Sequence, residues 1–272
     1  SYAGLRRDGD KRFPADGVIV LHALSINLPR LSYESNKDET YFRAKLAMIM
    51  QTAVNALQTR RKIIDNLAKK NLLPVLTSGS TMVSEEYVPL TVNLTGLNEA
   101  VTRLIGERAS MSERWSLTEK ILETAAKSAS DIGEKLGEDV RISVIRGDSG
   151  ARFASMDIEK YGRSATAIPP NKNEYSQTPA VTSTDIAKSD YLPALSRAYS
   201  SLTGGFVTEL EFPKSGSVGT LSEIIGNSQK SLEFFRFAYK MAVCRACGAK
   251  FPEGVLKCDS CKSTSMRLYS TI

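Results

Sequence analysis

Four cysteines near the C-terminal end are the residues whose types and spacing most clearly indicate chemistry. Cys244 and Cys247 are separated by two residues, and Cys258 and Cys261 repeat that spacing ten residues later. Two such pairs can surround one ion with four thiolates, which predicts a structural zinc ribbon. Four thiolate ligands leave no open position for water or substrate, so the metal is not expected to be catalytic. Two disulfides, four unpaired thiols and an iron–sulfur cluster are the alternatives.

A second group of candidate residues lies where an apolar segment ends. Residues 17–28 form an apolar run that predicts a buried strand, and Ser25, Asn27 and Arg30 lie near its end. Substrate contacts in α/β barrels come from the carboxyl ends of strands and the loops that follow them. Ser25 and Asn27 are therefore predicted to bind substrate, and capping of the strand end is the alternative role.

Asn98 and Glu99 lie in the first turn of a helix expected to begin near Leu97, directly after Gly96. The free N–H groups and the dipole at such a helix end attract phosphate, so Asn98 is a further candidate for substrate binding. A helix-start carboxylate that interacts only with the dipole is the alternative role for Glu99.

For two glycines and the histidine, the sequence favours a structural role over a role in binding or catalysis. Gly204 and Gly205 permit close approach of a ligand or a neighbouring backbone, and packing is the favoured interpretation. His22, the only histidine, lies among apolar residues and is expected in the core. Because there is one histidine and no GxxxxGK[ST] or GxGxxG motif, the sequence contains no Ser/His/Asp arrangement, P-loop or Rossmann fingerprint.

The elements that must position these residues alternate between strands and helices, which predicts an α/β fold with mostly parallel pairing. Besides the first strand, the apolar spacing and turn residues predict helices near 38–71, 112–136 and 218–230 and a helix that begins near residue 97. They also predict strands near 139–147, 204–212 and 232–243, and an irregular region at 164–193. Four or five strands are few for a closed barrel, so the chain is expected to be part of a larger assembly.

Composition limits the class of protein. The chain has 272 residues and a net charge of +6, a modest excess that favours anionic partners such as nucleotides. Its apolar runs are too short to predict a transmembrane helix, and its first residues have no apolar signal-peptide core. Clustered cysteines suit a reduced compartment, so we expect a cytoplasmic protein with no membrane association.

Several stretches resemble segments of the anaerobic, class III ribonucleoside-triphosphate reductases, a family of glycyl-radical enzymes. They are SINLPRLSYES (25–35), GLNEAV (96–101), ARFASMDIEKYG (151–162), LTGG (202–205) and EFFRFAYKMAVCRACGAKF (233–251). They occur in the order of the family and lead into the cysteine pairs. The resemblance covers essentially the whole chain.

The resemblance implies a radical reaction that converts a ribonucleoside triphosphate to a deoxyribonucleotide. In the family, a radical-SAM activating enzyme installs a radical on a glycine near the C-terminus. This radical generates a thiyl on a finger-loop cysteine within a ten-stranded α/β barrel, and the thiyl abstracts the ribose 3′-hydrogen. The zinc ribbon holds the glycine loop, and Tyr175 and Ser176 resemble a family segment close to the active site.

The sequence departs from the family at both radical positions. LYSTI (268–272) matches only the beginning of the tail that carries the glycine, and SYAGLRRDG (1–9) has no cysteine where the finger loop is expected. The chain is therefore interpreted as a fragment, a split subunit or a degenerate paralogue, and is expected to be inactive alone. A homodimer or pairing with an N-terminal reductase segment is predicted.

The resulting domain prediction is the C-terminal half of the reductase barrel at 1–240, a zinc ribbon at 241–265, and a truncated stub at 266–272 that precedes the expected glycyl-radical loop. A non-catalytic zinc-ribbon protein that docks on nucleic acid or on a partner protein is the alternative function.

Overall fold

The computed structural model describes residues 23–73, 88–168, 172–181, 190–211, 218–232, 234–238, 240–252 and 255–270. His22 and residues 17–22 of the first expected strand lie outside these ranges. The chain divides into two compact units, one formed by the residues up to Thr178 together with Arg197–Phe206, and the other by Pro179–Ser196 and Val207–Ile272.

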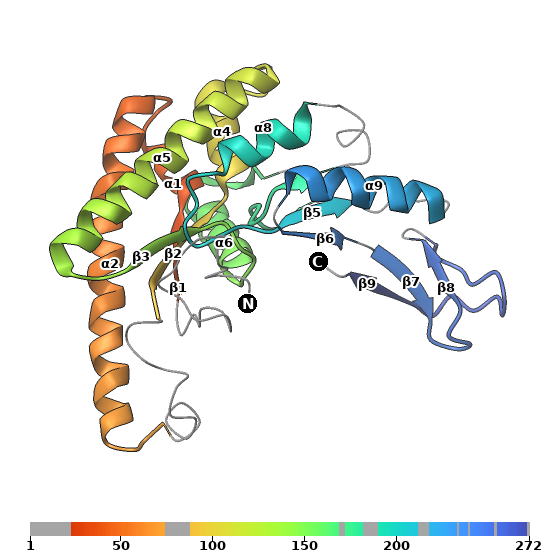
Figure 1. The fold of residues 1–272 in the computed structure, drawn as a ribbon. Helices are drawn as coiled ribbons and strands as arrows, with labels where there is room; N and C mark the ends of the chain where they lie inside the picture. The colour runs from red at the N-terminus through yellow and green to blue at the C-terminus, as the bar shows by residue number, and fades with distance from the viewer. Residues whose placement is uncertain are drawn as a thin grey trace. The chain divides into compact units, whose positions relative to one another are not determined.

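The first unit is built on a parallel sheet with the strand order β1-β2-β3 (Figure 1). Its elements in chain order are β1 (Ala23–Asn27), α1 (Leu28–Glu34), α2 (Glu39–Lys69), β2 (Leu90–Thr95), α4 (Leu97–Ile105), α5 (Met111–Leu136), β3 (Val140–Ser143), α6 (Ser149–Tyr161) and the 3-10 turn Arg163–Ala165. The parallel pairing predicted from the alternation of strands and helices is confirmed here.

One face of this sheet is polar and the other is apolar. The register aligns Ser25 with Asn93 and Asn93 with Ser143, and it aligns Asn27 with Thr95. Since successive side chains of a strand point to opposite faces, these five residues share one face. The alternating positions carry Leu24, Ile26, Leu90, Val92, Leu94, Val140 and Ile142.

Two long helices cover the apolar face. α2 begins at the N-cap Asp38 and buries Phe42, Leu46 and Met50. α5 begins with a capping box between Ser110 and Glu113 and ends at Gly137, whose φ is 65°. A Cβ at Gly133 of α5 would lie 3.4 Å from Cγ2 of Val140, so this helix packs closely against β3.

The segment at Gly204 approaches the free edge of β3, as the sequence predicted. The N–H of Gly204 donates to the carbonyl of Ile142 at 2.7 Å, and a Cβ at Gly204 would lie 2.8 Å from that same oxygen. Val144 and Phe206 then form a parallel bridge. Glycine at 204 therefore serves backbone packing.

The second unit contains a parallel sheet ordered β4-β5-β6 and an antiparallel sheet ordered β8-β7-β9. The strands are β4 (Ala180–Val181), β5 (Thr208–Glu211), β6 (Phe235–Ala238), β7 (Lys240–Cys244), β8 (Lys250–Pro252) and β9 (Met266–Ser270), and the helix α9 spans Val218–Ser231. β9 pairs with β7 along its whole length, so residues 266–270 form a strand of the ribbon sheet.

Other details differ from the sequence expectation. The described residues contain nine strands, where four or five were expected. The strand expected at 232–243 is two strands, β6 and β7, which belong to different sheets. The region at 164–193, expected to be irregular, contains β4 and the start of the helix α8 (Tyr191–Ala198). In the described parts of the chain, each helix is too short or too polar to cross a membrane.

Candidate functional site

Asp157 of α6 is the centre of a buried hydrogen-bond network at the carboxyl end of β1. Its side chain is fully buried, and its carboxylate accepts hydrogen bonds from Asn27, Arg30 and Tyr175. Oδ1 accepts from Nε of Arg30 at 2.7 Å, and Oδ2 accepts from Nδ2 of Asn27 at 2.8 Å. Burial of a carboxylate is costly without such partners. The network therefore fixes α6 against the end of β1.

Asn27 links the strand to the following helix. Its Oδ1 accepts from the N–H of Arg30 at 3.1 Å, which makes it the N-cap of α1. Its Nδ2 donates to Asp157, so both atoms of the amide have protein partners and its orientation is fixed. Among the described residues, one amide hydrogen and one lone pair of this side chain have no partner and can bind a ligand.

Two tyrosines extend the network. The hydroxyl of Tyr175 donates to Oδ2 of Asp157 at 2.9 Å and lies 3.0 Å from the hydroxyl of Tyr33. The Tyr33 hydroxyl also accepts from the N–H of Ala167 at 2.9 Å. Burial raises the pKa of both phenols, and the neighbouring Tyr33 raises the pKa of Tyr175 further. Both tyrosines are therefore neutral hydrogen-bonding groups at physiological pH.

Ser176 contacts the N-terminal end of α4, which the sequence suggested as a phosphate-binding site. Oε1 of Glu99 accepts from the N–H of Ser176 at 3.0 Å, and Oε2 accepts from its hydroxyl at 2.5 Å. Burial raises the pKa of the Glu99 carboxyl, and the hydrogen bonds from Ser176 oppose that shift. Glu99 thus positions the segment at 175–177, while its neighbour Asn98 is exposed on α4.

Asn93 organises the polar face beside this network. Its Oδ1 accepts from the N–H of Ile145 at 2.9 Å, and its Nδ2 donates to the hydroxyl of Ser25 at 3.2 Å. One row further along, the hydroxyls of Thr95 and Ser149 lie 2.9 Å apart and join β2 to the start of α6. Ser25 is thereby held by its neighbours on the sheet.

Four of the five predicted substrate-binding residues thus belong to connected polar groups. Asn27 and Tyr175 share Asp157, Ser25 contacts Asn93, and Ser176 contacts Glu99. Sequence reasoning missed Asp157, Tyr33 and Asn93. Asp157 had a signal, because it is an acidic residue on the face of α6 that also carries the buried Ala154. Asn93 had one as well, since it interrupts the apolar strand β2.

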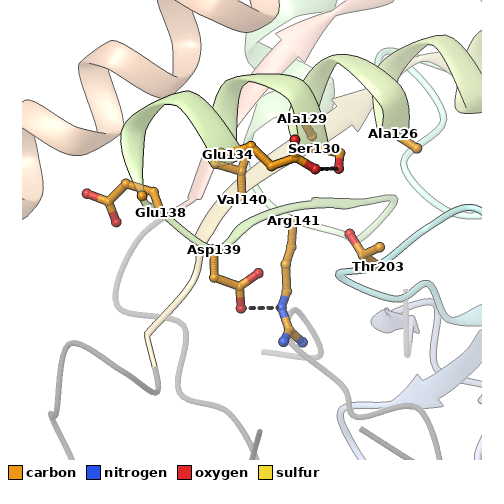
Figure 2. A pocket seen from close by; sticks show the side chains of 11 residues that line it. Ala126, Ala129, Ser130, Glu134, Glu138, Asp139, Val140, Arg141 and Thr203 are labelled. Atoms are coloured by element: carbon orange, nitrogen blue, oxygen red, sulfur yellow. Dashed lines mark hydrogen bonds and ion pairs between the residues drawn. The ribbon is translucent and has the colours of Figure 1, made fainter.

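A separate hollow of about 540 Å³ lies at the amino end of β3 (Figure 2). Glu134, Asp139 and Arg141 are among its lining residues, and Arg141 donates to Oδ2 of Asp139 at 3.0 Å. Parallel α/β sheets carry their active sites at the carboxyl ends of the strands. This hollow lies at the opposite end of β3, so we do not assign it to the candidate site.

The four cysteines form a compact cluster at one end of the ribbon sheet. All four sulfurs lie within 4.8 Å of one another, with Cys244 and Cys261 at 3.4 Å and Cys247 and Cys258 at 3.5 Å. A tetrahedral zinc site with Zn–S bonds near 2.3 Å requires sulfur separations of about 3.8 Å. The donor set and its spacing therefore fit one zinc ion.

The two cysteine pairs have the same local backbone. The N–H of Gly248 donates to the carbonyl of Cys244, and the N–H of Lys262 donates to the carbonyl of Cys258, each at 2.9 Å. The residue after each pair has positive φ, 76° at Gly248 and 60° at Lys262. Hydrogen bonds, chiefly from the backbone N–H of Cys247, lower the pKa of Cys244 to about 6, whereas neighbouring cysteines raise the pKa of Cys247 and Cys261. The spacing of the four sulfurs, and not these shifts, indicates a metal site.

Comparisons with known proteins agree with this fold. The family model for the anaerobic ribonucleoside-triphosphate reductase matches residues 5–272. The anaerobic ribonucleotide reductase from Thermotoga maritima with dATP bound in the specificity site is 19% identical with a TM-score of 0.72, covering 94% of this chain and 43% of that one. The same enzyme in complex with dATP and CTP is 19% identical with a TM-score of 0.71, covering 93% and 43%.

A further solved structure, described as an anaerobic ribonucleotide reductase, is 19% identical with a TM-score of 0.73, covering 94% of this chain and 40% of that one. No curated protein matches the sequence. This chain spans less than half the length of the solved structures that it matches. Because the family model matches nearly all of its residues, the chain belongs to the anaerobic ribonucleoside-triphosphate reductase family.

Proposed function

We propose that this chain provides the C-terminal part of a catalytic domain that reduces ribonucleoside triphosphates to deoxyribonucleotides in the cytoplasm. The observation that carries the proposal is the family match over residues 5–272, which includes both the polar sheet face and the cysteine ribbon. The Thermotoga maritima enzyme of this family binds CTP. By analogy, the substrate of this chain is a ribonucleoside triphosphate.

The substrate ribose would lie against the carboxyl ends of β1 and β2. Asn27 can offer one amide hydrogen and one lone pair there, held in place by Asp157 and Arg30. Neutral amide and hydroxyl groups can bind ribose hydroxyls without placing a net charge beside a radical intermediate. Ser25, Tyr175 and Ser176 would support this position, and Asn98 would lie toward the phosphates.

The four cysteines would hold a structural zinc ion, because their sulfurs form a closed four-thiolate set. The zinc would supply rigidity at the base of the tail that carries the glycyl radical in this family, with a radical-SAM activating enzyme as the source of that radical. This sequence has no cysteine outside the ribbon. The thiyl cysteine would therefore lie outside these 272 residues, in the N-terminal part of the reductase, whether on the same chain or on one that pairs with it.

A binding experiment tests the substrate assignment. The zinc-loaded chain is titrated with CTP and with dCTP by calorimetry, and we expect CTP to bind at least about 10-fold more tightly because a site built to hydrogen-bond a ribose hydroxyl rejects the analogue that lacks it. Asp157→Asn should abolish that preference, while Glu159→Gln, an exposed change on the same helix, should retain it. Equal affinities for CTP and dCTP would contradict the assignment.

A further inference from the structure

The cysteine ribbon, residues 240–270, carries most of the net positive charge of the chain. It contains six Lys or Arg and two Asp or Glu, a net charge of +4, whereas the whole chain of 272 residues has +6. A zinc ion held by four thiolates would add two negative charges, which offset about half of this excess. The ribbon therefore stays basic with its metal in place, while the other 241 residues together carry only +2.

Several of these cations have no acidic partner. Four exposed side chains of the ribbon form no ion pair with any described residue: Arg245, Lys250, Lys257 and Lys262. By contrast, the cations in the strands of the two parallel sheets are paired, Arg141 with Asp139 and Arg236 with Glu209. The ribbon thus presents its charges to an anion from outside the chain.

Three of the ribbon cations share one face of the sheet β8-β7-β9 (Figure 1). Lys250 and Arg267 both lie opposite Val243, on the strands at either side of β7. Neighbouring strands are about 4.8 Å apart, so these two positions are about 10 Å apart. Arg245 follows Val243 by two residues, and its N–H donates to the carbonyl of Ser265 at 2.9 Å, so it continues the same face. We call Arg245, Lys250 and Arg267 the ribbon basic face.

The opposite face of this sheet is apolar and carries a predicted metal ligand. Ala242 lies opposite both Phe251 and Leu268, and it shares its face with Cys244. Leu268 is exposed there. A membrane-binding surface needs cations beside apolar side chains that enter the lipid. Because the exposed leucine and the cations point to opposite sides, the ribbon basic face does not fit a membrane.

The residue types of the ribbon basic face favour nucleic acid over an acidic protein. Lysine is depleted in protein–protein interfaces, whereas protein–nucleic acid interfaces are much more positively charged. Cations held by a sheet can neutralise successive phosphates and release the counterions condensed on them. This contact reads no base, so it is independent of nucleotide sequence.

From these observations we propose that the ribbon basic face binds the phosphate backbone of nucleic acid, an activity separate from ribonucleotide reduction. Three neutralised phosphates give a slope of log K against log salt of about −2.1 for a single strand and about −2.7 for a duplex. So few contacts make the binding weak, with a dissociation constant on the order of 100 μM at physiological salt and a lower value at low salt.

Fluorescence anisotropy of a labelled oligothymidylate of about 30 nucleotides tests the proposal. The zinc-loaded chain is titrated at salt concentrations from about 25 to 200 mM, and the expected slope is about −2. A mixed-sequence strand of the same length should bind equally, and a duplex should give the steeper slope. Arg245→Gln combined with Lys250→Gln should weaken binding at least 10-fold at the lowest salt and reduce the slope by about 1.4.

Lys127→Gln combined with Lys135→Gln is the matched control, because it removes the same charge from exposed positions of α5. It should leave the affinity within about 2-fold of the unmodified chain. Zinc content and circular dichroism verify that each variant keeps its ribbon folded. Lys250→Gln combined with Arg267→Gln is a second test pair and should weaken binding to the same extent as the first.

Three results would overturn the proposal. One is the absence of binding by the unmodified chain at about 25 mM salt. Another is equal weakening by the ribbon and the α5 variants, which would show that only the net charge matters. The third is displacement of the oligonucleotide by polyglutamate as readily as by unlabelled oligothymidylate, which would assign the ribbon basic face to an acidic protein.

Discussion

At the scale of single residues, Asp157 shows how one buried carboxylate can organise several candidate binding groups. It receives hydrogen bonds from an amide and a guanidinium at the start of α1 and from a phenol far along the chain, so the donors come from two separate segments. Each donor is thereby fixed before any ligand arrives, which reduces the entropy that binding must overcome.

Replacing this carboxylate should cost considerable stability. Asp157→Asn leaves Arg30 without its ion partner and puts an amide where three donors converge, so we expect a loss of about 3 kcal/mol in the free energy of unfolding. Urea denaturation measures it. Glu159→Gln, on the exposed side of the same helix, should change stability by less than about 0.5 kcal/mol. Equal effects of the two substitutions would show that the network contributes no stability.

Gly96 is required by both backbone conformation and space. Its φ is 77°, and a Cβ there would lie 2.4 Å from Cγ of Pro29. Gly96→Ala should therefore cost about 3 kcal/mol, the sum of left-handed strain and a clash with a rigid ring. Gly137→Ala is the control, because its φ of 65° is similar but, among the described residues outside its own chain neighbours and helix backbone, no atom lies within 4 Å of an added Cβ.

Gly137→Ala introduces left-handed backbone strain but no clash, so it should lower the free energy of unfolding by about 1 kcal/mol. Thermal or urea unfolding of both variants measures the difference. A Gly96 variant no less stable than the Gly137 variant would mean that Pro29 moves aside freely.

Glu99 should make stability fall as pH rises. Its pKa is raised in the folded chain by burial, so the unfolded chain loses its proton first, and stability falls between about pH 4.3 and the raised value. Glu99→Gln does not titrate. Its stability relative to the unmodified chain should therefore improve from pH 4 to pH 7, as measured by urea denaturation at low salt.

Glu113 provides a control of opposite sign. Hydrogen bonds from Ser110 lower the pKa of its carboxyl, so its contribution appears above the unfolded pKa and is lost as the pH falls. Glu113→Gln should therefore become relatively less stable from pH 4 to pH 7. The same trend in both variants would refute the assignment of these shifts.

At the scale of elements, the sequence predicted those helices and strands whose periodicity is long and regular. The spacing of Phe42, Leu46 and Ala53 located α2, and alternation in β3 located that strand. α1 was not predicted, because Pro29 was interpreted as the end of a strand. Asn27 as N-cap and proline in the first turn are in fact a helix-start signal.

The two candidate sites also differ in how far the sequence could predict them. Cysteine spacing specified the ribbon cluster without knowledge of the fold, because all its ligands come from two short turns. The Asp157 network could not be predicted in this way, since Asn27 and Asp157 are 130 residues apart and meet only through the packing of α6. Contacts at such separation leave no fixed spacing in the sequence.

The ribbon should depend on its metal. Cys261→Ser should abolish zinc binding and increase hydrogen exchange over residues 240–270, because a closed four-thiolate site supplies the folding energy of such a small sheet. Exchange in β1, β2 and β3 should stay unchanged. Ser260→Ala, an exposed change in the same turn, should retain one zinc per chain by elemental analysis. One zinc ion per chain in the Cys261→Ser variant would contradict a site with four cysteine ligands.

At the scale of the whole molecule, the chain should not complete the reductase reaction alone. It has no cysteine outside the ribbon, so with a radical-SAM activating enzyme, a reductant and all four ribonucleotides under anaerobic conditions we expect no deoxyribonucleotide. Extending the chain by the glycine-bearing tail of the family should give a glycyl-radical doublet by electron paramagnetic resonance, but still no product.

Product should appear only when a cysteine-bearing N-terminal reductase segment is added to the extended chain. Chromatographic separation of deoxyribonucleotides checks this, with the extended chain carrying Cys261→Ser as the control that lacks an ordered ribbon. Product from the 272-residue chain alone would mean that the reaction does not use a thiyl donor outside the ribbon.

The pairing of β9 with β7 determines the point at which the chain leaves the ribbon sheet. Ser270 lies opposite Lys240, so the chain leaves the ribbon at the end remote from the cysteines. Each residue beyond Ser270 adds at most about 3.6 Å to the distance that the chain can reach from that end of the strand. If the ribbon were unfolded, the same residues would be connected to β6 only through the flexible segment 240–270, whose typical span is about 30 Å. A metal that keeps the ribbon folded would thus limit how far the residues beyond Ser270 can move.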